Sequence, residues 1–189
     1  RYSGSTGEAT VTGSDSQWNN SQYLYVGYVG NGALNVTDGG LVSNVDDGSI
    51  GYISGSTGVA TVTGSGSQWN NSEELYVGRS GSGTLNVESG GVVSNTHGYI
   101  GDQLGSTGLA TVTGADSQWN NSAFLYVGLS GDGTLNVEAG GEVSSSSGEI
   151  GKYSGSTGLA TVTGADSQWN NSNLLYVGDY GSGTLNVAA

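Results

Sequence analysis

Cysteine, proline and methionine are absent from the 189-residue sequence, and lysine plus arginine amount to only three residues. The absence of cysteine excludes disulfide bonds and thiolate metal sites. Because the formal net charge is -13, we expect neither nucleic acid nor an anionic lipid surface as a partner. No apolar run approaches the ~20 residues of a membrane-spanning helix, so membrane insertion is not expected either.

Glycine is abundant, with 37 residues, and it belongs to motifs that recur along the chain. The motif GSTG begins at Gly4, Gly55, Gly105 and Gly155, with spacings of 51, 50 and 50 residues. Periods of about 20 to 50 residues are typical of solenoids, propellers and repeat arrays. We therefore read residues 1–189 as a single repeat domain with units 1–51, 52–101, 102–151 and 152–189, of which the last is incomplete.

Each unit contains a second, shorter period of about 25 residues. In motifs such as ATVTG and TLNVE, apolar and polar residues alternate, which indicates a β-strand. Two further short apolar segments follow in every coil, and glycine-rich corners separate them. Three short parallel strands per coil, with no helical pattern, predict an all-β fold, a parallel β-helix. The strand motifs are centred on Val11, Val36, Val62, Val87, Val112, Val137, Val162 and Val187.

The 50-residue repeat arises because two kinds of coil alternate. One kind, here called the Trp coil, carries alanine, tryptophan and leucine at its three inward positions. The other, the Val coil, carries leucine, valine and glycine there. Alternating side-chain sizes fill a core densely, so we predict a core that contains Trp18, Trp69, Trp119, Trp169, Val11, Val62, Val112 and Val162. The alternative is that the tryptophans form an exposed platform for sugars.

The motif SQWNNS follows the same logic and occurs once in every Trp coil. Its NNS segment is interpreted as the corner after the tryptophan strand. Asparagine tolerates left-handed backbone conformations and its side-chain amides can stack into ladders along a solenoid.

The residues needed for catalysis are scarce. His97 is the only histidine, and it lies in a variable corner without a repeated partner. Most acidic residues follow the repeat, whereas Asp46 and Asp47 lie in a one-residue insertion that we interpret as a solvated loop. Polysaccharide-cleaving β-helices need a non-repeating cluster of acid and base groups. We therefore expect no enzyme activity and no cofactor, with at most weak Ca²⁺ binding at aspartates in the corners.

The motif GSGTLNVESGGVV at residues 81–93, repeated in tandem, resembles the glycine-rich repeats of bacterial autotransporter passenger regions and related large surface adhesins. The resemblance extends over the whole chain. It implies a right-handed parallel β-helix that is exported and displayed at the cell surface. It carries no catalytic residues over to this sequence.

Three functions are consistent with these patterns. The first is a non-catalytic structural element of the extracellular surface, such as a stalk, filament or matrix component. The second is a module that binds glycans or cells through two exposed columns. One column is formed by Tyr25, Tyr76, Tyr99, Tyr126 and Tyr176, and the other by the outward glutamines Gln17, Gln68, Gln118 and Gln168. The third is an ice-binding face built from outward pairs of threonines, although Glu88 and Glu138 interrupt it; the pairs are Thr10/Thr12, Thr61/Thr63, Thr111/Thr113 and Thr161/Thr163.

The two ends of the sequence show no polar capping repeat. The first motif opens a Trp coil, and the last, GTLNVAA, is the first strand of a Val coil. An open solenoid end exposes core and unpaired strand edges. We therefore expect further coils, or neighbouring copies stacked end to end, to cover the ends.

Overall fold

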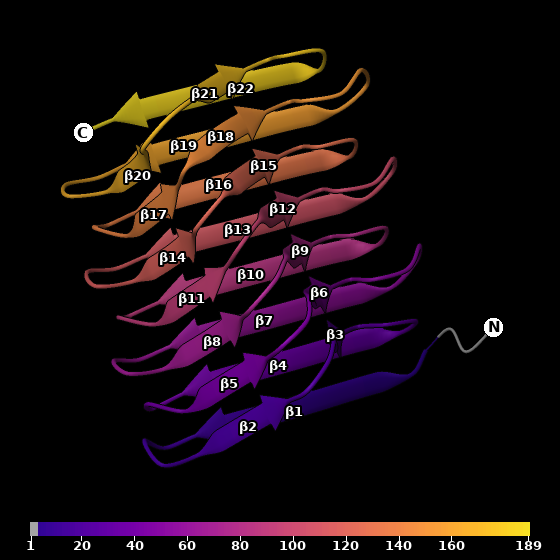
Figure 1. Ribbon diagram of the computed structural model, residues 1–189, viewed down its shortest axis with the longest axis vertical. Helices are drawn as coiled ribbons and strands as arrows, with labels where there is room; N and C mark the ends of the chain where they lie inside the picture. Colours follow the sequence, from indigo (N-terminus) through magenta and orange to yellow (C-terminus); the bar gives the residue numbers. More distant parts are fainter. Residues whose placement is uncertain (1–3) are drawn as a thin grey trace.

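A computed structural model describes residues 4–189 of the chain, which form 22 β-strands and no helix. The strands wind upward in successive rungs from the N-terminal coil to the C-terminal coil (Figure 1). They form three parallel sheets of eight, seven and seven strands; each of the first seven coils contributes one strand to every sheet, and β22 adds the eighth strand of the first sheet. Within residues 4–189 no segment is both helical and apolar over the length that a bilayer crossing needs.

The strands of each sheet are as follows. The first sheet contains β1 (Thr6–Thr12), β4 (Asn31–Thr37), β7 (Thr57–Thr63), β10 (Ser82–Glu88), β13 (Thr107–Thr113), β16 (Asp132–Glu138), β19 (Thr157–Thr163) and β22 (Ser182–Ala188). The second contains β2 (Gln17–Asn20), β5 (Leu41–Asn44), β8 (Gln68–Asn71), β11 (Val92–Asn95), β14 (Gln118–Asn121), β17 (Glu142–Ser145) and β20 (Gln168–Asn171). The third contains β3 (Leu24–Val26), β6 (Gly48–Ile50), β9 (Leu75–Val77), β12 (Gly98–Ile100), β15 (Phe124–Val127), β18 (Ser147–Ile150) and β21 (Leu175–Val177).

The pairing register follows the sequence period. Val11 lies opposite Val36, and Val36 lies opposite Val62, so that equivalent residues of successive coils stack directly. In the second sheet Trp18 pairs with Val42, and in the third sheet Leu24 pairs with Gly48. The prediction of a parallel β-solenoid with about 25 residues and three short strands per coil is therefore confirmed.

The core runs along the axis of the solenoid. Trp69 and Trp119 are completely buried, and Val62 and Val112 share the same interior. Val11 and Val162 are buried near the two ends. Trp18 and Trp169 are only partly buried, because each belongs to an outermost rung of its sheet and has a neighbouring strand on one side alone.

The two kinds of coil fit together through glycine. A Cβ atom added to Gly98 would lie 3.0 Å from Cζ2 of Trp119 and 2.8 Å from Cδ1 of Leu125. Gly48 stands in the same relation to Trp69 and Leu75 in the coil that follows it. The Val coil thus leaves the space that the larger side chains of the next Trp coil fill.

The NNS segments differ from the expected corner. Both asparagines of each motif belong to the strand, and the second asparagine points into the core. Asn44 and Asn95 occupy the same inward position in Val coils, where their Oδ1 atoms accept hydrogen bonds from the Nε1 atoms of Trp69 (3.0 Å) and Trp119 (2.7 Å). A buried indole N–H needs an acceptor, and the strand register supplies it from the preceding coil. An amide ladder exists, but it is internal.

Candidate binding face

The repeat units differ from one another mainly around the third sheet. The first strand of every Trp coil contains ATVT, whereas the segments that flank the third sheet read QYLYVGYV, EELYVGRS, AFLYVGLS and NLLYVGDY in the four Trp coils. The corresponding segments of the Val coils read DDGSIGYI, THGYIGDQ and SSGEIGKY. We call the outward side chains of these segments the aromatic face; it comprises residues 22–29, 46–53, 73–80, 96–103, 123–130, 146–153 and 173–180.

Rings and cations gather on this face. Every tyrosine that the structure describes lies on it, together with the only phenylalanine, Phe124, and the only histidine, His97. Arg79 and Lys152, the lysine and arginine residues within positions 4–189, lie there as well. The outward positions of the other two sheets carry mainly threonine, asparagine, glutamine, serine and acidic residues, with single aliphatic residues such as Val59 and Leu109 among them.

The centre of the face is a ladder of three stacked rings. The ring centroids of Tyr76 and Tyr99 are 4.8 Å apart at an interplanar angle of 10°, and those of Tyr99 and Tyr126 are 5.1 Å apart at 14°. These distances match the spacing of about 4.8 Å between neighbouring strands. The rings therefore lie face to face along the solenoid, and all three are partly exposed.

A cation closes each end of the ladder. Cζ of Arg79 lies 4.5 Å from the ring centroid of Tyr76, and Nζ of Lys152 lies 4.5 Å from that of Tyr126. Arg79 also lies 5.0 Å from the ring of Tyr52, and Lys152 forms an ion pair of 3.1 Å with Glu149. Cations over ring faces are attracted by the ring quadrupole. The faces of the three tyrosines are consequently occupied by each other and by the two cations.

The sequence-predicted tyrosine column is only partly continuous. Tyr76, Tyr99 and Tyr126 are in direct register and form the ladder. Ser49 separates Tyr25 from the ladder, and Glu149 separates Tyr176 from it. The sequence spacing placed the five residues in one column correctly, but the ladder is interrupted where a Val coil lacks tyrosine.

Tyr25 belongs instead to a separate cluster near the N-terminal end. Its ring meets those of Tyr28 and Tyr52 edge-on, with centroid distances of 5.1 Å and 4.6 Å. Tyr28 and Tyr52 stack on each other at 5.0 Å, and Tyr23 stacks on Tyr25 at 5.9 Å. Tyr23 and Tyr28 are about half exposed, so this cluster offers more accessible ring surface than the ladder does.

A second column of the face brings Asp47, Glu74 and His97 together. The backbone N–H of Glu74 donates to Oδ1 of Asp47 (3.3 Å), and Nδ1 of His97 lies 3.8 Å from Oε1 of Glu74. The His97 ring stacks parallel to Phe124, with centroids 6.3 Å apart. Asp47 lies half-buried in the loop between β5 and β6, and His97 lies in the equivalent corner of the next Val coil, beside Glu74 and Phe124. The grouping could have been found in the sequence, because all three residues directly precede an inward leucine or glycine in consecutive coils.

Several pKa values on this face are shifted. A hydrogen bond with the Asp47 carboxyl, together with burial and repulsion, raises the pKa of Glu74 from 4.5 to about 7. Burial raises the pKa of Asp102 to about 6, although Arg79 opposes this shift. Burial also raises the pKa of Tyr99 to about 12, and it raises the pKa of Tyr76 and Tyr126 as well. The tyrosine hydroxyls therefore stay neutral donors at physiological pH.

The arrangement of acidic groups differs from that of a glycoside hydrolase. Such enzymes separate their two carboxyl groups by roughly 5 to 9.5 Å so that they flank the scissile bond, whereas the Asp47 carboxylate here accepts a hydrogen bond from the backbone N–H of Glu74. Between residues 4 and 189, no three histidine, cysteine, aspartate or glutamate side chains gather in a way that could hold a metal ion.

The outward face of the first sheet carries the predicted threonine pairs. Thr37, Thr63 and Thr113 form a row with Glu88 and Glu138 in direct register. A second row contains Asn35, whose Nδ2 donates to Oε1 of Glu8 at 3.0 Å. The Glu88 and Glu138 carboxylates therefore interrupt the row of threonines, as expected from the sequence.

Two curated proteins are similar to parts of the chain. An uncharacterized lipoprotein of Escherichia coli K12, YdeK, is 40% identical over 78 residues, which are 38% of this chain and 6% of that protein. The adhesin BmaC autotransporter of Brucella suis biovar 1 is 34% identical over 96 residues, which are 48% of this chain and 3% of that protein. The chain thus corresponds to a small fraction of either relative. No protein-family model and no solved structure matches it.

These similarities and the solenoid fit a repeat region like that of an adhesin passenger, with a structural or adhesin role at the surface. A lipoprotein and an autotransporter as relatives suggest a location at the cell surface or outside the cell. The adhesin relative and the β-solenoid repeats suggest a non-enzymatic protein.

Proposed function

We propose that the chain is a non-catalytic segment of an extracellular rod that holds other parts of a bacterial surface adhesin away from the cell, as a stalk, filament or matrix element. The observation that carries this proposal is the unbroken register of all three sheets through the solenoid. A continuous core and continuous sheets favour a stiff spacer whose length depends on the number of coils.

The alternation of coils gives a direct test of the spacer role. Deleting residues 102–151 removes one Trp coil and one Val coil and joins two equivalent positions. The shortened chain should fold, and because neighbouring strands are about 4.8 Å apart, small-angle scattering should report a rod shorter by about 10 Å.

The matched control deletes a single coil, residues 107–131, so that two Val coils become neighbours. This deletion should lower the melting temperature strongly, because the space beside Gly98 loses the tryptophan and leucine that fill it. If the two shortened chains had the same melting temperature, the rod could not be built from pairs of one Trp coil and one Val coil. A chain whose length does not follow the number of coil pairs would contradict the spacer role itself.

A second candidate function is binding of glycans or partner cells through the aromatic face. The favouring observation is that Tyr23 and Tyr28 remain about half exposed in a cluster of four tyrosines. The ladder of Tyr76, Tyr99 and Tyr126 offers sugars hydroxyl edges rather than ring faces, because the faces are covered. Binding by stacking would therefore concentrate at the N-terminal cluster.

A panel of immobilised neutral and acidic glycans tests this candidate. If a glycan binds, Tyr28→Ala should weaken binding about tenfold, as expected for loss of an aromatic contact of ~1.4 kcal/mol. Thr61→Ala on the opposite sheet should leave it unchanged. Absence of binding to the whole panel, or equal binding by both variants, would contradict glycan recognition through this cluster.

We regard ice binding as the weakest of the three functions. The threonine rows of the first sheet are regular, but Glu88 and Glu138 put charge into the rank at every second coil of its central part. If the protein leaves the growth of ice crystals unchanged, this function is excluded.

A further inference from the structure

The corners that follow β6, β9 and β12 enclose a hollow at the edge of the aromatic face. It has a volume of about 550 Å³, which lies in the range of pockets that hold small molecules. Arg79, Ser80 and Gln103 contribute polar groups to it, and Ile53 and Leu104 contribute apolar side chains. Complete coils precede and follow these three coils, so the hollow is formed by the middle of the solenoid and not by either end.

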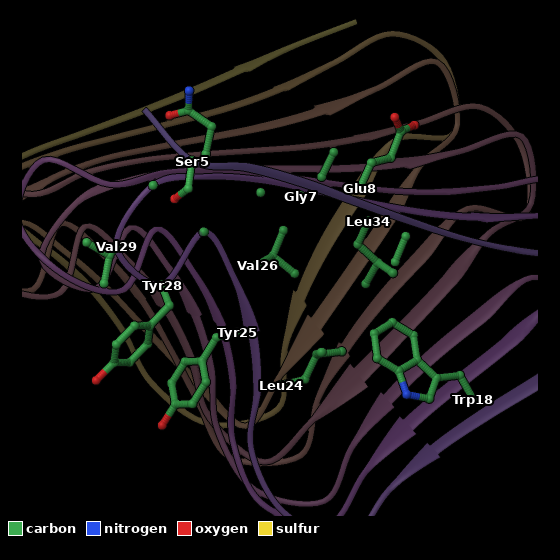
Figure 2. Close-up of a pocket in the computed structure, with 16 residues that line it drawn as sticks. Ser5, Gly7, Glu8, Trp18, Leu24, Tyr25, Val26, Tyr28, Val29 and Leu34 are labelled. Carbon is green, nitrogen blue, oxygen red and sulfur yellow. The ribbon is translucent and has the colours of Figure 1, made fainter. Parts of the chain in front are cut away.

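Arg79 is held in place by aromatic rings. Its Cζ lies 4.5 Å from the ring centroid of Tyr76 and 5.0 Å from that of Tyr52. Tyr28 stacks on Tyr52 in turn, with centroids 5.0 Å apart, and Figure 2 shows the rings of Tyr28 and Tyr25 outside the core side chains of the first coil. Stacking on a ring occupies the face of a guanidinium group, so the N–H groups along its edge stay available for a planar anion.

The two cations of the aromatic face differ in their partners. Nζ of Lys152 lies 3.1 Å from a carboxylate oxygen of Glu149. Within residues 4–189, the Arg79 guanidinium forms neither an ion pair nor a hydrogen bond with another side chain. Asp102 occupies the corner position of Arg79 in the next coil, and the two attract each other without forming an ion pair. Arg79 is therefore a positioned cation whose hydrogen-bond donors are free.

Gln103 adds a second donor to the hollow. Oγ of Ser80 donates a hydrogen bond to Oε1 of Gln103 at 2.7 Å. Because the amide oxygen is engaged within the protein, the Nε2 amino group is left to donate to a ligand. None of the described residues that line the hollow is acidic, although the whole chain has a net charge of -13. The hollow thus combines donors and one positive charge with the side chain of Leu104, which is 83% exposed.

We propose that this hollow is a binding site for a sugar that carries a carboxylate group. The carboxylate accepts hydrogen bonds from the edge of the Arg79 guanidinium and from the Gln103 amide, while an apolar face of the sugar ring lies against Leu104. Guanidinium and carboxylate groups pair through two parallel hydrogen bonds, which are stronger than those between neutral groups. The remaining negative charges oppose binding only weakly at physiological salt, because exposed charges more than about 8 Å away are largely screened.

A sugar acid fits the hollow better than a bare anion does. A carboxylate alone would use the guanidinium and leave the exposed Leu104 side chain and most of the volume without a partner. The inference rests on the second candidate function, glycan binding at the aromatic face, and assigns it a ligand class. It is independent of the spacer role.

Titration of the isotope-labelled 189-residue chain with tetragalacturonate, followed by NMR at neutral pH and physiological salt, tests the site. The Nε–H resonance of Arg79 and the backbone resonances of Ser80 and Gln103 should shift until saturation. Neutral maltotetraose, sodium acetate and an oligoglutamate peptide should shift them far less at equal concentration. Arg79→Lys should weaken binding of tetragalacturonate about tenfold, because lysine keeps the charge but lacks the two parallel donors.

Two further variants separate the site from general charge and from loss of structure. Lys152→Gln removes the other cation of the face and should leave binding unchanged. Asp102→Asn removes the carboxylate that attracts Arg79 and should strengthen binding several-fold, an effect that unfolding cannot produce.

Equal binding by Arg79→Lys, or weaker binding by Asp102→Asn, would overturn the assignment of the site and leave glycan binding by the N-terminal cluster standing. Equal shifts with acetate or with the peptide would show a site for anions in general and would overturn the proposal too. If neither tetragalacturonate nor any other glycan binds, the second candidate function is overturned together with this inference.

Discussion

The outward face of the first sheet and the aromatic face are built on the same backbone. Both consist of parallel strands stacked in direct register over the whole solenoid. On the first sheet the outward residues repeat with small changes, whereas on the third sheet tyrosine, serine, glutamate, histidine and aspartate succeed one another at equivalent positions. The difference shows that stacking in register does not by itself dictate the outward side chains, because the same backbone carries a repeating set on one face and a varied set on another.

The aromatic face is nevertheless more than a varied surface. Its three-tyrosine ladder, with Arg79 and Lys152 over its two end rings, couples four successive coils through side chains. The threonine rows make only scattered hydrogen bonds, such as Thr57 Oγ1 to Asn31 Oδ1 at 2.6 Å. We therefore expect the aromatic face to contribute more to the free energy of unfolding than the threonine rows do. Both contributions should be much smaller than that of the core.

Replacing a core tryptophan should have the largest effect. Trp119→Ala removes a completely buried side chain and leaves the amide oxygen of Asn95 without its donor, so the free energy of unfolding should fall by about 3–5 kcal/mol. Chemical denaturation measures the loss. Thr111→Ala, on the outward side of the adjoining strand, should change it by less than about 0.5 kcal/mol; similar losses for both would contradict the separation of core and face.

Filling the glycine position should come second. Gly98→Val introduces a side chain where even Cβ lies 2.8 Å from Leu125, and overpacking of this kind costs about 1–3 kcal/mol. In the double variant Gly98→Val with Trp119→Val, the smaller side chain at position 119 leaves room for the new valine. The double variant should therefore lose less stability than the two single variants lose together. If the changes in unfolding free energy were strictly additive in this double-mutant cycle, the glycine of the Val coil and the tryptophan of the Trp coil would not be packed against each other.

Interrupting the aromatic ladder should have a smaller effect. Tyr99→Ala leaves the rings of Tyr76 and Tyr126 without their common neighbour, and we expect a loss of about 1–2 kcal/mol. The matched control is Asn86→Ala, at an outward position of the first sheet in the same coil as Tyr99. Its loss of stability should be only a few tenths of the loss caused by Tyr99→Ala. If the control costs as much as Tyr99→Ala, the ladder contributes nothing specific.

The smallest effect concerns the pH dependence. The folded-state pKa of Glu74 lies at about 7, above its ordinary value of 4.5, so between these values the folded chain binds more protons than the unfolded chain. The contribution of Glu74 to stability should therefore be most favourable below about pH 4.5 and decline as the pH rises to about 7. Glu74→Gln should raise stability at pH 8 by on the order of 1 kcal/mol, after allowance for screening at this partly exposed site.

Thermal unfolding between pH 4 and pH 8 measures this change, and Glu142→Gln on the second sheet serves as its control. A pH profile that is the same for the Glu74 variant and the unmodified chain would show that the carboxyl pair with Asp47 does not influence folding. If Glu74→Gln were less stable than the unmodified chain at pH 8, the ionised Glu74 carboxylate would stabilise the fold, which contradicts the prediction.

The sequence by itself determined the parallel solenoid, the length of its coils and the alternation of Trp and Val coils. Each of these follows from local periodicity, because stacking equivalent residues in register turns every repeated position into a column. The column of inward tryptophans and the compensating glycines could be recognised from residue size alone.

Only the tertiary structure decided what the columns do to one another. The inward turn of the second asparagine in NNS, the ladder of Tyr76, Tyr99 and Tyr126 with its two cations, and the meeting of Asp47, Glu74 and His97 all depend on contacts between coils. A sequence period places residues in the same column, but the orientation of a ring, the partner of an amide and the pKa of a carboxyl depend on the side chains above and below. Those neighbours are about 25 residues away in the sequence and become adjacent only when the chain has wound once around its core.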